Sequence, residues 1–362
     1  MKTKGRNQKS RHRAIVTLAF VLSSFIFTTF YVASPSSFGQ GALTPPGAPA
    51  PLFKTLQQVE PRTPVASAPF TITNPGSYYL TTNLTPGSGM NGIIIQTNNV
   101  TLDLSGFSLI GAGGASTGIV VSAGRANIAI FNGTITGWNQ AVGAGFSVNC
   151  HLKDLQAFGN IVGILSGTNG VVENCVVSGS TGTGFSIGAG GLARHCFAFT
   201  NGTFGFTVNV GTVLACTARL NGSNGIDGAG MLVADCNVFN NGGQGINDSG
   251  TSIIRGCRVE DNALDGIRVG VGTLVAGNNC NGTTNGSGRA LIRATGSRNR
   301  IEDNHVTQGD NGIVVGATNN LIIRNSAFRN TVNYVITTGN MVGPTNSVGG
   351  VVTNHPWANF SF

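Results

Sequence analysis

A glycine followed by isoleucine or phenylalanine recurs at a nearly constant interval along the middle of this chain. Successive members of the series are 20 or 21 residues apart, and one gap is 46 residues, which is about twice that length. The series consists of Gly163, Gly184, Gly205, Gly225, Gly245, Gly266 and Gly312. Self-similarity at such a period is the signature of a solenoid, in which each repeat stacks on the next.

The residue types within one repeat favour strands. Val, Ile, Thr, Asn and Gly dominate, whereas residues that favour helices are scarce. Three short strands per turn, stacked in parallel at about 4.8 Å per coil, describe a parallel β-helix. Weaker units begin near Gly92, Gly118, Ala141, Ala290 and Tyr334. The sequence therefore predicts an all-β parallel β-helix of about eleven coils, since the leucine spacing of a leucine-rich repeat is absent.

Aligning the repeats on their glycines brings identical residue types into columns. One column holds Cys175, Cys196, Cys216, Cys236 and Cys257, and continues as Asn278, Asn304 and Asn325. A second column, five residues later, holds Asn201, Asn221, Asn241, Asn262 and Asn330. An apolar column holds Ile164, Phe185, Phe206, Ile226, Ile246, Ile267 and Ile313. We expect asparagine to satisfy backbone groups in the bends and the apolar column to form a narrow core.

The chain contains seven cysteines, and their alignment argues against disulfides. Stacked parallel strands hold neighbouring Cβ atoms nearly 5 Å apart, whereas a disulfide needs about 3.8 Å. We expect a stack of small buried side chains, with one or two strained bridges as the alternative, and the column offers no tetrahedral metal site. Cys280 aligns with Val259 and Val306, and Cys150 lies outside both columns.

The N-terminal segment reads as an export signal or a membrane anchor, assigned to residues 1–42. Six basic residues in the first thirteen precede the uncharged, mostly apolar stretch from Ala14 to Val32. Without those six, 15 basic residues face 13 acidic ones, so the high isoelectric point does not indicate nucleic-acid binding. We expect a secreted or cell-surface protein that contacts membrane only through this segment, if it stays uncleaved.

Three further regions follow. Residues 43–90 are interpreted as a proline-rich linker and N-terminal cap, with a short helix from Leu52 to Val59. Residues 91–340 form the predicted β-helix, and residues 341–362 form a C-terminal tail or cap.

With the repeats identified, the chain resembles the right-handed parallel β-helix proteins of the pectin-lyase-like superfamily. The resemblance covers about Asn91 to Asn340. The segments 54–64 (KTLQQVEPRTP), 70–80 (FTITNPGSYYL) and 354–360 (NHPWANF) resemble the opening and the tail of an exported bacterial subgroup of undefined function. The superfamily includes pectate lyases, polygalacturonases, alginate and chondroitin lyases and phage tailspikes. Membership of a fold implies none of these activities by itself.

Charged residues concentrate near one coil. A polygalacturonase-like motif is absent, since the sequence has neither Gly-His-Gly nor an Asp-Asp pair. The candidate substrate-binding residues, for an anionic sugar, are Arg255, Arg258, Glu260, Asp261, Asp265, Arg268 and His305. The alternative is a solvated surface whose opposite charges pair weakly. Catalytic residues stay unassigned, and no cofactor or metal is expected except Ca²⁺ if the chain is a lyase.

Two functions remain open at this stage. The clear coils vary by only one residue in length, whereas active sites in such folds use long insertions to wall a groove. We therefore expect a non-catalytic polysaccharide-binding or cell-surface structural module, with a polysaccharide or cell-envelope glycan as partner. The alternative is a polysaccharide lyase or glycoside hydrolase acting on an acidic polysaccharide. Among the aromatics, we expect Trp138 to seal a coil edge and the phenylalanines of the Gly-Phe units to be core.

Overall fold

The computed structural model describes residues 59–114, 116–283, 288–347 and 353–362. The expected export segment and residues 52–58 of the expected short helix lie outside the described residues. Glu60–Phe362 forms one compact unit. Within the described ranges, we find no helix whose length and apolar character would let it cross a bilayer.

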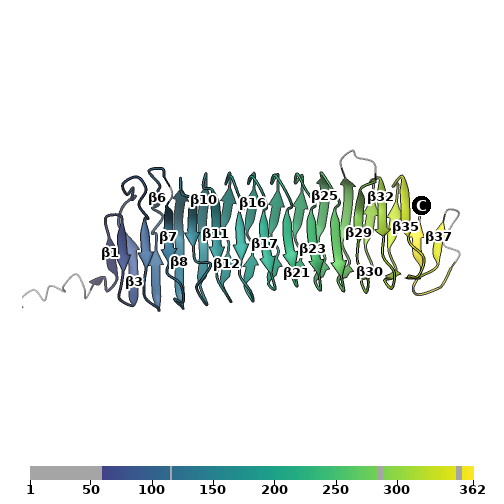
Figure 1. Cartoon of the computed structure of the whole chain (residues 1–362), viewed down its shortest axis with the longest axis horizontal. Coiled ribbons are helices and arrows are strands. Elements are labelled where there is room, and N and C mark those ends of the chain that lie inside the picture. The colour runs from purple at the N-terminus through teal and green to yellow at the C-terminus, as the bar shows by residue number, and fades with distance from the viewer. Residues whose placement is uncertain (1–58, 115, 284–287, 348–352) are drawn as a thin grey trace, which may run out of the picture. The chain divides into compact units, whose positions relative to one another are not determined.

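The unit is a stack of coils in which every strand pairing is parallel (Figure 1). One wall of the stack is a thirteen-stranded sheet in strict chain order. Its strands are β2 (Phe70–Ile72), β4 (Ile93–Ile95), β7 (Thr117–Val121), β9 (Gln140–Gly143), β11 (Val162–Ser166), β14 (Phe185–Ile187), β17 (Phe206–Asn209), β20 (Ile226–Ala229), β23 (Ile246–Gly250), β26 (Ile267–Val271), β29 (Ala290–Ala294), β32 (Asn311–Val315) and β35 (Val332–Ile336).

The second sheet has two arms that form the other walls. The first arm contains β1 (Thr63–Val65), β3 (Gly76–Leu80), β5 (Val100–Asp103), β12 (Val171–Glu173), β15 (Leu192–Arg194), β18 (Thr212–Leu214), β21 (Leu232–Ala234), β24 (Ile253–Arg255), β27 (Leu274–Ala276), β30 (Arg300–Glu302), β33 (Leu321–Ile323) and β36 (Met341–Val342). The second arm contains β6 (Ser108–Ile110), β13 (Val176–Ser178), β16 (Phe197–Phe199), β19 (Thr217–Arg219), β22 (Asn237–Phe239), β25 (Arg258–Asn262), β28 (Asn279–Thr283), β31 (His305–Thr307), β34 (Ser326–Phe328), β37 (Thr345–Ser347) and β38 (Asn359–Ser361). Two long strands, β8 (Ile128–Thr136) and β10 (His151–Phe158), pair with both arms and so join them into one sheet.

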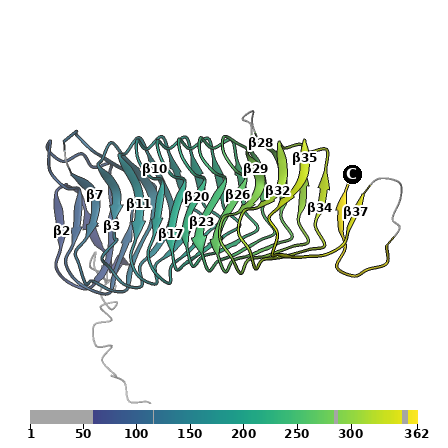
Figure 2. The ribbon, with the colours of Figure 1, turned by 45° about the vertical axis from the view of Figure 1, so that its right-hand side comes forward.

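The predicted fold class is confirmed, but the coil count was too low. The described part has thirteen coils rather than about eleven, which corresponds to a rod of about 60 Å at about 4.8 Å per coil (Figure 2). A segment assigned to the cap supplies an additional coil, because Phe70 and Ile72 of β2 pair in register with Ile93 and Ile95. The ladders thus extend beyond the expected limits of 91 and 340, from β1 to β38.

The bend between the two arms is held by the predicted cysteine and asparagine column. The Asn278 side chain donates to Asn304 Oδ1 at 2.9 Å, and Asn304 donates to Asn325 Oδ1 at 3.0 Å. The Cys257 backbone N–H joins the two halves by donating to Asn278 Oδ1 at 3.0 Å. All seven cysteines are free and buried, which confirms the stack of small side chains, and burial raises the pKa of the Cys280 thiol.

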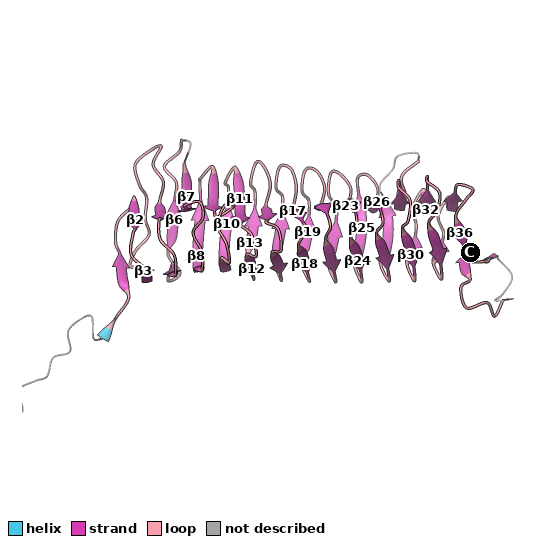
Figure 3. Cartoon of the chain, turned by 60° about the horizontal axis from the view of Figure 1, so that its bottom comes forward, coloured by secondary structure: helices cyan, strands magenta, loops and turns pink. Residues whose placement is uncertain are grey.

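The second asparagine column is also confirmed, at the turn that leaves the second arm. Asn221 donates to Asn241 Oδ1 at 2.9 Å and to the Ala198 carbonyl at 3.2 Å, and it accepts from Asn201. The column satisfies buried backbone groups that would otherwise be unpaired. Because each bond runs from one coil to the next, the turns stay short and regular along the rod (Figure 3).

The apolar column of the thirteen-stranded sheet is buried and in register, as predicted. Phe185 and Phe206 stack with ring centroids 4.8 Å apart. Ile292 fills the gap between Ile267 and Ile313, which confirms that the long glycine interval spans two coils. Trp138 is buried and donates from Nε1 to the Leu109 carbonyl at 3.1 Å, so it seals a coil edge as expected.

Candidate functional site

The seven residues predicted to bind substrate lie on different walls of the rod. Arg255 ends β24 on the first arm, whereas Arg258 and Glu260 lie on β25 in the second arm. Asp265 is in the turn that follows, and Arg268 is an exposed residue of β26 in the thirteen-stranded sheet. The structure therefore distributes six of the seven around the circumference of one coil and places His305 two coils further along.

Within that group only some members are brought together. Arg258 and Glu260 form an ion pair of 2.7 Å across one strand. Asp261 occupies a left-handed corner position with φ of 48°, a conformation that aspartate tolerates. His305 lies in the same column as Arg258, through Asn279, and its Nδ1 is 2.9 Å from Ser326 Oγ.

A polar column on the thirteen-stranded sheet brings charged groups of neighbouring coils into line. Asp227, Asn247, Arg268 and Arg293 occupy the same register position on β20, β23, β26 and β29. We call these four residues the arginine column. Their backbone neighbours Ile226, Ile246, Ile267 and Ile292 are buried, so strand alternation directs the four polar side chains outward.

Hydrogen bonds organise both ends of this column. Asp227 Oδ1 accepts from the side-chain amides of Asn224 and Asn247, at 2.7 and 2.9 Å. At the other end, Arg293 Nε donates to Asp265 Oδ2 at 2.8 Å, and Asp265 Oδ1 accepts from the Ala290 backbone at 2.8 Å. Asp265 is thus a predicted residue that the structure does bring to the column.

Arg268 is the charged member with the least restraint. It is exposed, and no carboxylate in the described part of the chain pairs with it. Arg268 and Arg293 stand on adjacent coils, so their Cα atoms are spaced by about one strand separation, about 4.8 Å. A planar guanidinium binds a carboxylate through two parallel hydrogen bonds, so two of them in line suit a chain that carries repeated carboxylates.

Asp248 follows Asn247 of this column in the sequence, but its side chain is not part of the column. It is one residue out of register with Asp227, and it is buried. Its carboxylate accepts from the Gly250 backbone at 2.9 Å, from Ser252 Oγ at 2.6 Å and from the Thr273 hydroxyl. Asp248 therefore stabilises a turn.

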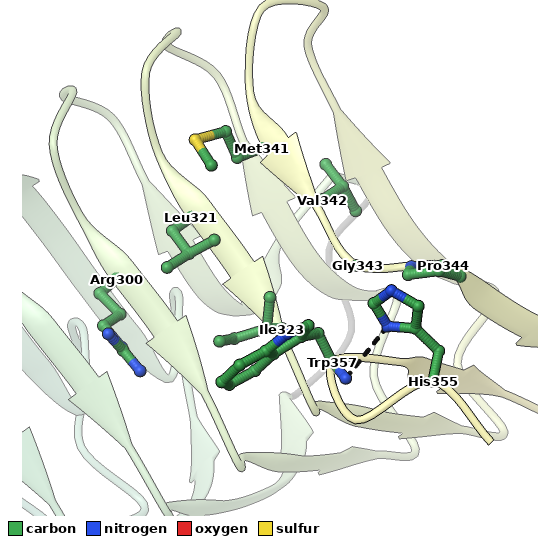
Figure 4. A pocket seen from close by; sticks show the side chains of 9 residues that line it. All are labelled: Arg300, Leu321, Ile323, Met341, Val342, Gly343, Pro344, His355 and Trp357. Atoms are coloured by element: carbon green, nitrogen blue, oxygen red, sulfur yellow. Dashed lines mark hydrogen bonds between the residues drawn. The ribbon is translucent and has the colours of Figure 1, made fainter.

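A hollow of about 370 Å³ lies near the C-terminal end of the first arm, between β33 and the tail (Figure 4). Leu321 and Ile323 form an apolar floor, and Trp357, which is 45% exposed, forms a wall. The cations at the edge are already paired. Arg300 binds Glu302 at 2.7 Å, and Arg324 lies over the Trp357 ring and binds Asp303 at 2.7 Å. Hydrogen bonding from Arg324 lowers the pKa of Asp303.

Sequence reasoning missed Arg293 because its coil is longer than the clear, regular coils. It pairs with Arg268 across a gap of 25 residues, whereas the clear coils repeat at 20 or 21. The isoleucine series gives the signal that would have found it, since Ile292 precedes Arg293 as Ile267 precedes Arg268.

Several phenylalanines were also missed as surface residues. The two in Gly-Phe units, Phe185 and Phe206, are buried as predicted. In contrast, Phe197 and Phe199 flank buried Ala198 on β16 and therefore point outward. The alternation Phe-Ala-Phe after Cys196 was the available signal, because the cysteine marks the start of the second arm.

Comparisons with known proteins support the fold. No protein-family model matches the sequence, and no curated protein matches it either. Among solved structures, the A-module of the mannuronan C-5 epimerase AlgE6 from Azotobacter vinelandii is 16% identical, with a TM-score of 0.58 over 80% of this chain and 90% of that one. PfbA, a surface adhesin of Streptococcus pneumoniae, is 11% identical, with a TM-score of 0.53 over 76% of this chain and 83% of that one.

A third similar structure is the catalytic unit of a GH87 α-1,3-glucanase from Streptomyces thermodiastaticus. It is 12% identical, with a TM-score of 0.51 over 83% of this chain and 61% of that one. At such identities the likeness shows the fold alone, which is the right-handed parallel β-helix of pectin-lyase-like proteins.

Proposed function

We propose that this chain is an exported, non-catalytic β-helix rod that binds an acidic polysaccharide along the arginine column. The observation that carries the proposal is the in-register placement of Arg268 and Arg293 on adjacent coils. A polyuronate presents carboxylates at regular intervals. Arg268 can bind one of them. Arg293, which already donates to Asp265 and to the Gly288 carbonyl, has further N–H groups to donate to another. The export expected from the N-terminal sequence would place the rod at the cell surface or outside the cell, where such polymers occur.

The surroundings of the column favour binding over chemistry. Asp227, the carboxylate of the column, already accepts two amide hydrogen bonds that fix its Oδ1. The turns beside β20 and β23 are as short as elsewhere in the central coils, so the Asp227 end of the column lies on an open sheet face. The named similar structures include an epimerase, a glucanase and an adhesin, so a polysaccharide partner is compatible with both enzymes and binding proteins on this fold.

Binding assays on the full chain test the proposal. Wild-type protein would be titrated with polymannuronate, polygalacturonate and neutral dextran, while absorbance reports any unsaturated uronide. We expect binding to the two acidic polymers, no binding to dextran and no unsaturated product. The double variant Arg268→Gln/Arg293→Gln should bind at least about tenfold more weakly, because a hydrogen bond to a charged group contributes about 1.5–3 kcal/mol.

The matched control is Arg255→Gln. Arg255 also pairs with no carboxylate among the described residues, but it lies on the first arm. It removes one positive charge, as each substitution of the double variant does, but from a different wall, and it should leave binding within about twofold. If both variants weakened binding equally, the loss would come from net charge and not from a site at the arginine column. Formation of unsaturated product would establish a lyase instead.

A further inference from the structure

The outer face of the second arm carries a column in which aromatic rings alternate with small or basic residues. Phe158, Ser178, Phe199, Arg219 and Phe239 occupy one register position on five successive coils. We call these five residues the aromatic column. It lies on a different wall from the arginine column, and nothing in the proposed function depends on it.

The rings of this column face solvent. Their neighbours Ala157, Ala198 and Val238 are buried, and strand alternation turns the phenylalanines outward. Phe158 is 45% exposed, whereas Phe199 and Phe239 are half-buried. Phe199 and Phe239 keep part of their surface in contact with water, because strand alternation turns them away from the core. A contiguous row of apolar groups that is left partly open to water is a candidate binding surface.

The spacing of the rings limits what fits them. Phe158, Phe199 and Phe239 are each two coils apart, which is about 9.6 Å at about 4.8 Å per coil. A β-1,4-linked glycan in its extended, ribbon-like form turns over at each link, so every second sugar presents the same face. The length of that two-sugar repeat is close to the rise of two coils. The apolar C–H face of every second sugar can therefore pack on one ring.

The charge between the rings fits an acidic member of this class. The Arg219 guanidinium lies over the Phe199 ring, 5.1 Å from its centroid, and no carboxylate in the described ranges pairs with it. In register, Arg219 stands on the coil between those of Phe199 and Phe239. A carboxylate on the sugar between those that stack on the two rings would complement it.

We propose that the aromatic column is a second binding face, which holds one extended β-1,4-linked glycan chain parallel to the rod. Phe158, Phe199 and Phe239 stack on alternate sugars, and Arg219 binds an acidic group on the sugar between two of them. The face selects for linkage through ring spacing and for charge through Arg219. It goes beyond the proposed function because a neutral glycan of the right linkage should also bind.

Three hexasaccharides distinguish this face from the arginine column. The full chain would be titrated calorimetrically with cellohexaose (neutral, β-1,4), hexamannuronate (acidic, β-1,4) and laminarihexaose (neutral, β-1,3). We expect cellohexaose to bind, and laminarihexaose, whose chain coils, to bind at least about tenfold more weakly. Arg268→Gln/Arg293→Gln should leave cellohexaose affinity unchanged, so failure of the proposed function and failure of this inference give different results.

Variants assign the binding to the column. Phe199→Ser/Phe239→Ser should weaken cellohexaose binding at least about tenfold, and Phe199→Trp should retain it. Arg219→Gln should weaken hexamannuronate binding but spare cellohexaose. Phe131→Ser, at an outward position of the first arm, is the matched control and should have no effect. The inference is overturned if wild-type protein does not bind cellohexaose, or if the folded Phe199→Ser/Phe239→Ser variant, checked by circular dichroism, binds it as wild type does.

Discussion

The arginine column and the aromatic column belong to one rod and overlap only in the coil of β20 and β22, and they differ in how their members are held. In the arginine column, neighbours restrain the polar groups: Asp227 is bound by two amides and Arg293 by Asp265. In the aromatic column, the one ring contact found among the described residues is that of Arg219 over Phe199. The comparison shows that surface residues of a β-helix which can act together are stacked in one column, each on a different coil. This follows because each wall keeps its own register from coil to coil, independently of the other walls.

Both columns depend on an interior that is nearly the same from coil to coil. The inward positions are restricted to apolar groups or to amides that bond along the rod. The outward positions meet no such restriction. Changes to the interior should therefore affect both faces equally, whereas changes to one face should leave the other unaltered.

The largest effect is expected from Asn221→Ala, in the interior. Asn221 gives and receives several buried hydrogen bonds, including one from the Asn201 backbone at 3.2 Å. Leaving these partners unsatisfied should lower the free energy of unfolding by about 2–4 kcal/mol, as measured by urea denaturation. Asn237→Ala, at an exposed position of β22, should change it by less than about 0.5 kcal/mol. If the folded Asn221→Ala variant lost binding at one column but kept it at the other, the expectation that the interior supports both columns equally would be wrong.

Charge reversal at the arginine column should give the next largest effect. Arg268→Glu places a carboxylate where the polymer's own carboxylate must lie, so binding of polymannuronate should fall by about 100-fold or more. Cellohexaose affinity should not change, because the aromatic column lies on another wall. A parallel loss of both affinities in calorimetry would show that the two columns form one site.

Raising the ionic strength should weaken binding at the arginine column but not at the aromatic column, and the effect should be smaller than that of charge reversal. Raising NaCl from about 50 to about 500 mM shortens the screening length to a few ångströms and should weaken polymannuronate binding about tenfold. Stacking on phenylalanine is not screened, so cellohexaose binding should change less than about twofold. If cellohexaose showed the same salt dependence, charge rather than stacking would be holding it.

The smallest effect is expected on the first arm, which carries neither column. Arg194 binds Glu173 at 2.9 Å and, with a further contribution from His151, lowers the pKa of that carboxyl below its usual value of 4.5. A carboxyl whose pKa is lower in the folded state adds stability above its unfolded pKa and loses it as pH falls toward the folded pKa. The melting temperature of Glu173→Gln should therefore fall slightly less than that of wild type between about pH 5 and pH 3. A larger acid sensitivity in the variant would contradict this assignment, and both glycan affinities should be unchanged at neutral pH.

The interior of the fold was predictable from sequence for a physical reason. Positions such as Asn241 and Ile246 tolerate few residue types, so the period is visible as repeated letters. The coil at Phe70 was missed because no Gly-Ile or Gly-Phe marks it. The outward residues were harder to place, because many residue types are tolerated at solvent-exposed positions. The repeat is therefore not visible in the identity of these residues.

The candidate site shows the same limit. Grouping charges by closeness in sequence selected residues around one coil, such as Arg255 and Arg258, which point from different walls. Residues that share a wall are about one coil apart in sequence, as Arg268 and Arg293 are. Asp265 and Arg268 were included in the predicted group, but their partner Arg293 was not. The coil that leads to Arg293 is unusually long, so Arg293 did not align with the other repeats.

The tail strand β38 closes one end of the second arm. It lies between β34 and β37, and Asn359 accepts from the Asn325 backbone at 3.0 Å, so an amide from far along the chain completes the column. An open parallel ladder would offer its last strand as a template to the first strand of another molecule. Here the edge beyond β38 is the three-residue strand β37, which presents few backbone groups. We therefore expect this edge to be a poor template for end-to-end stacking of one rod on another.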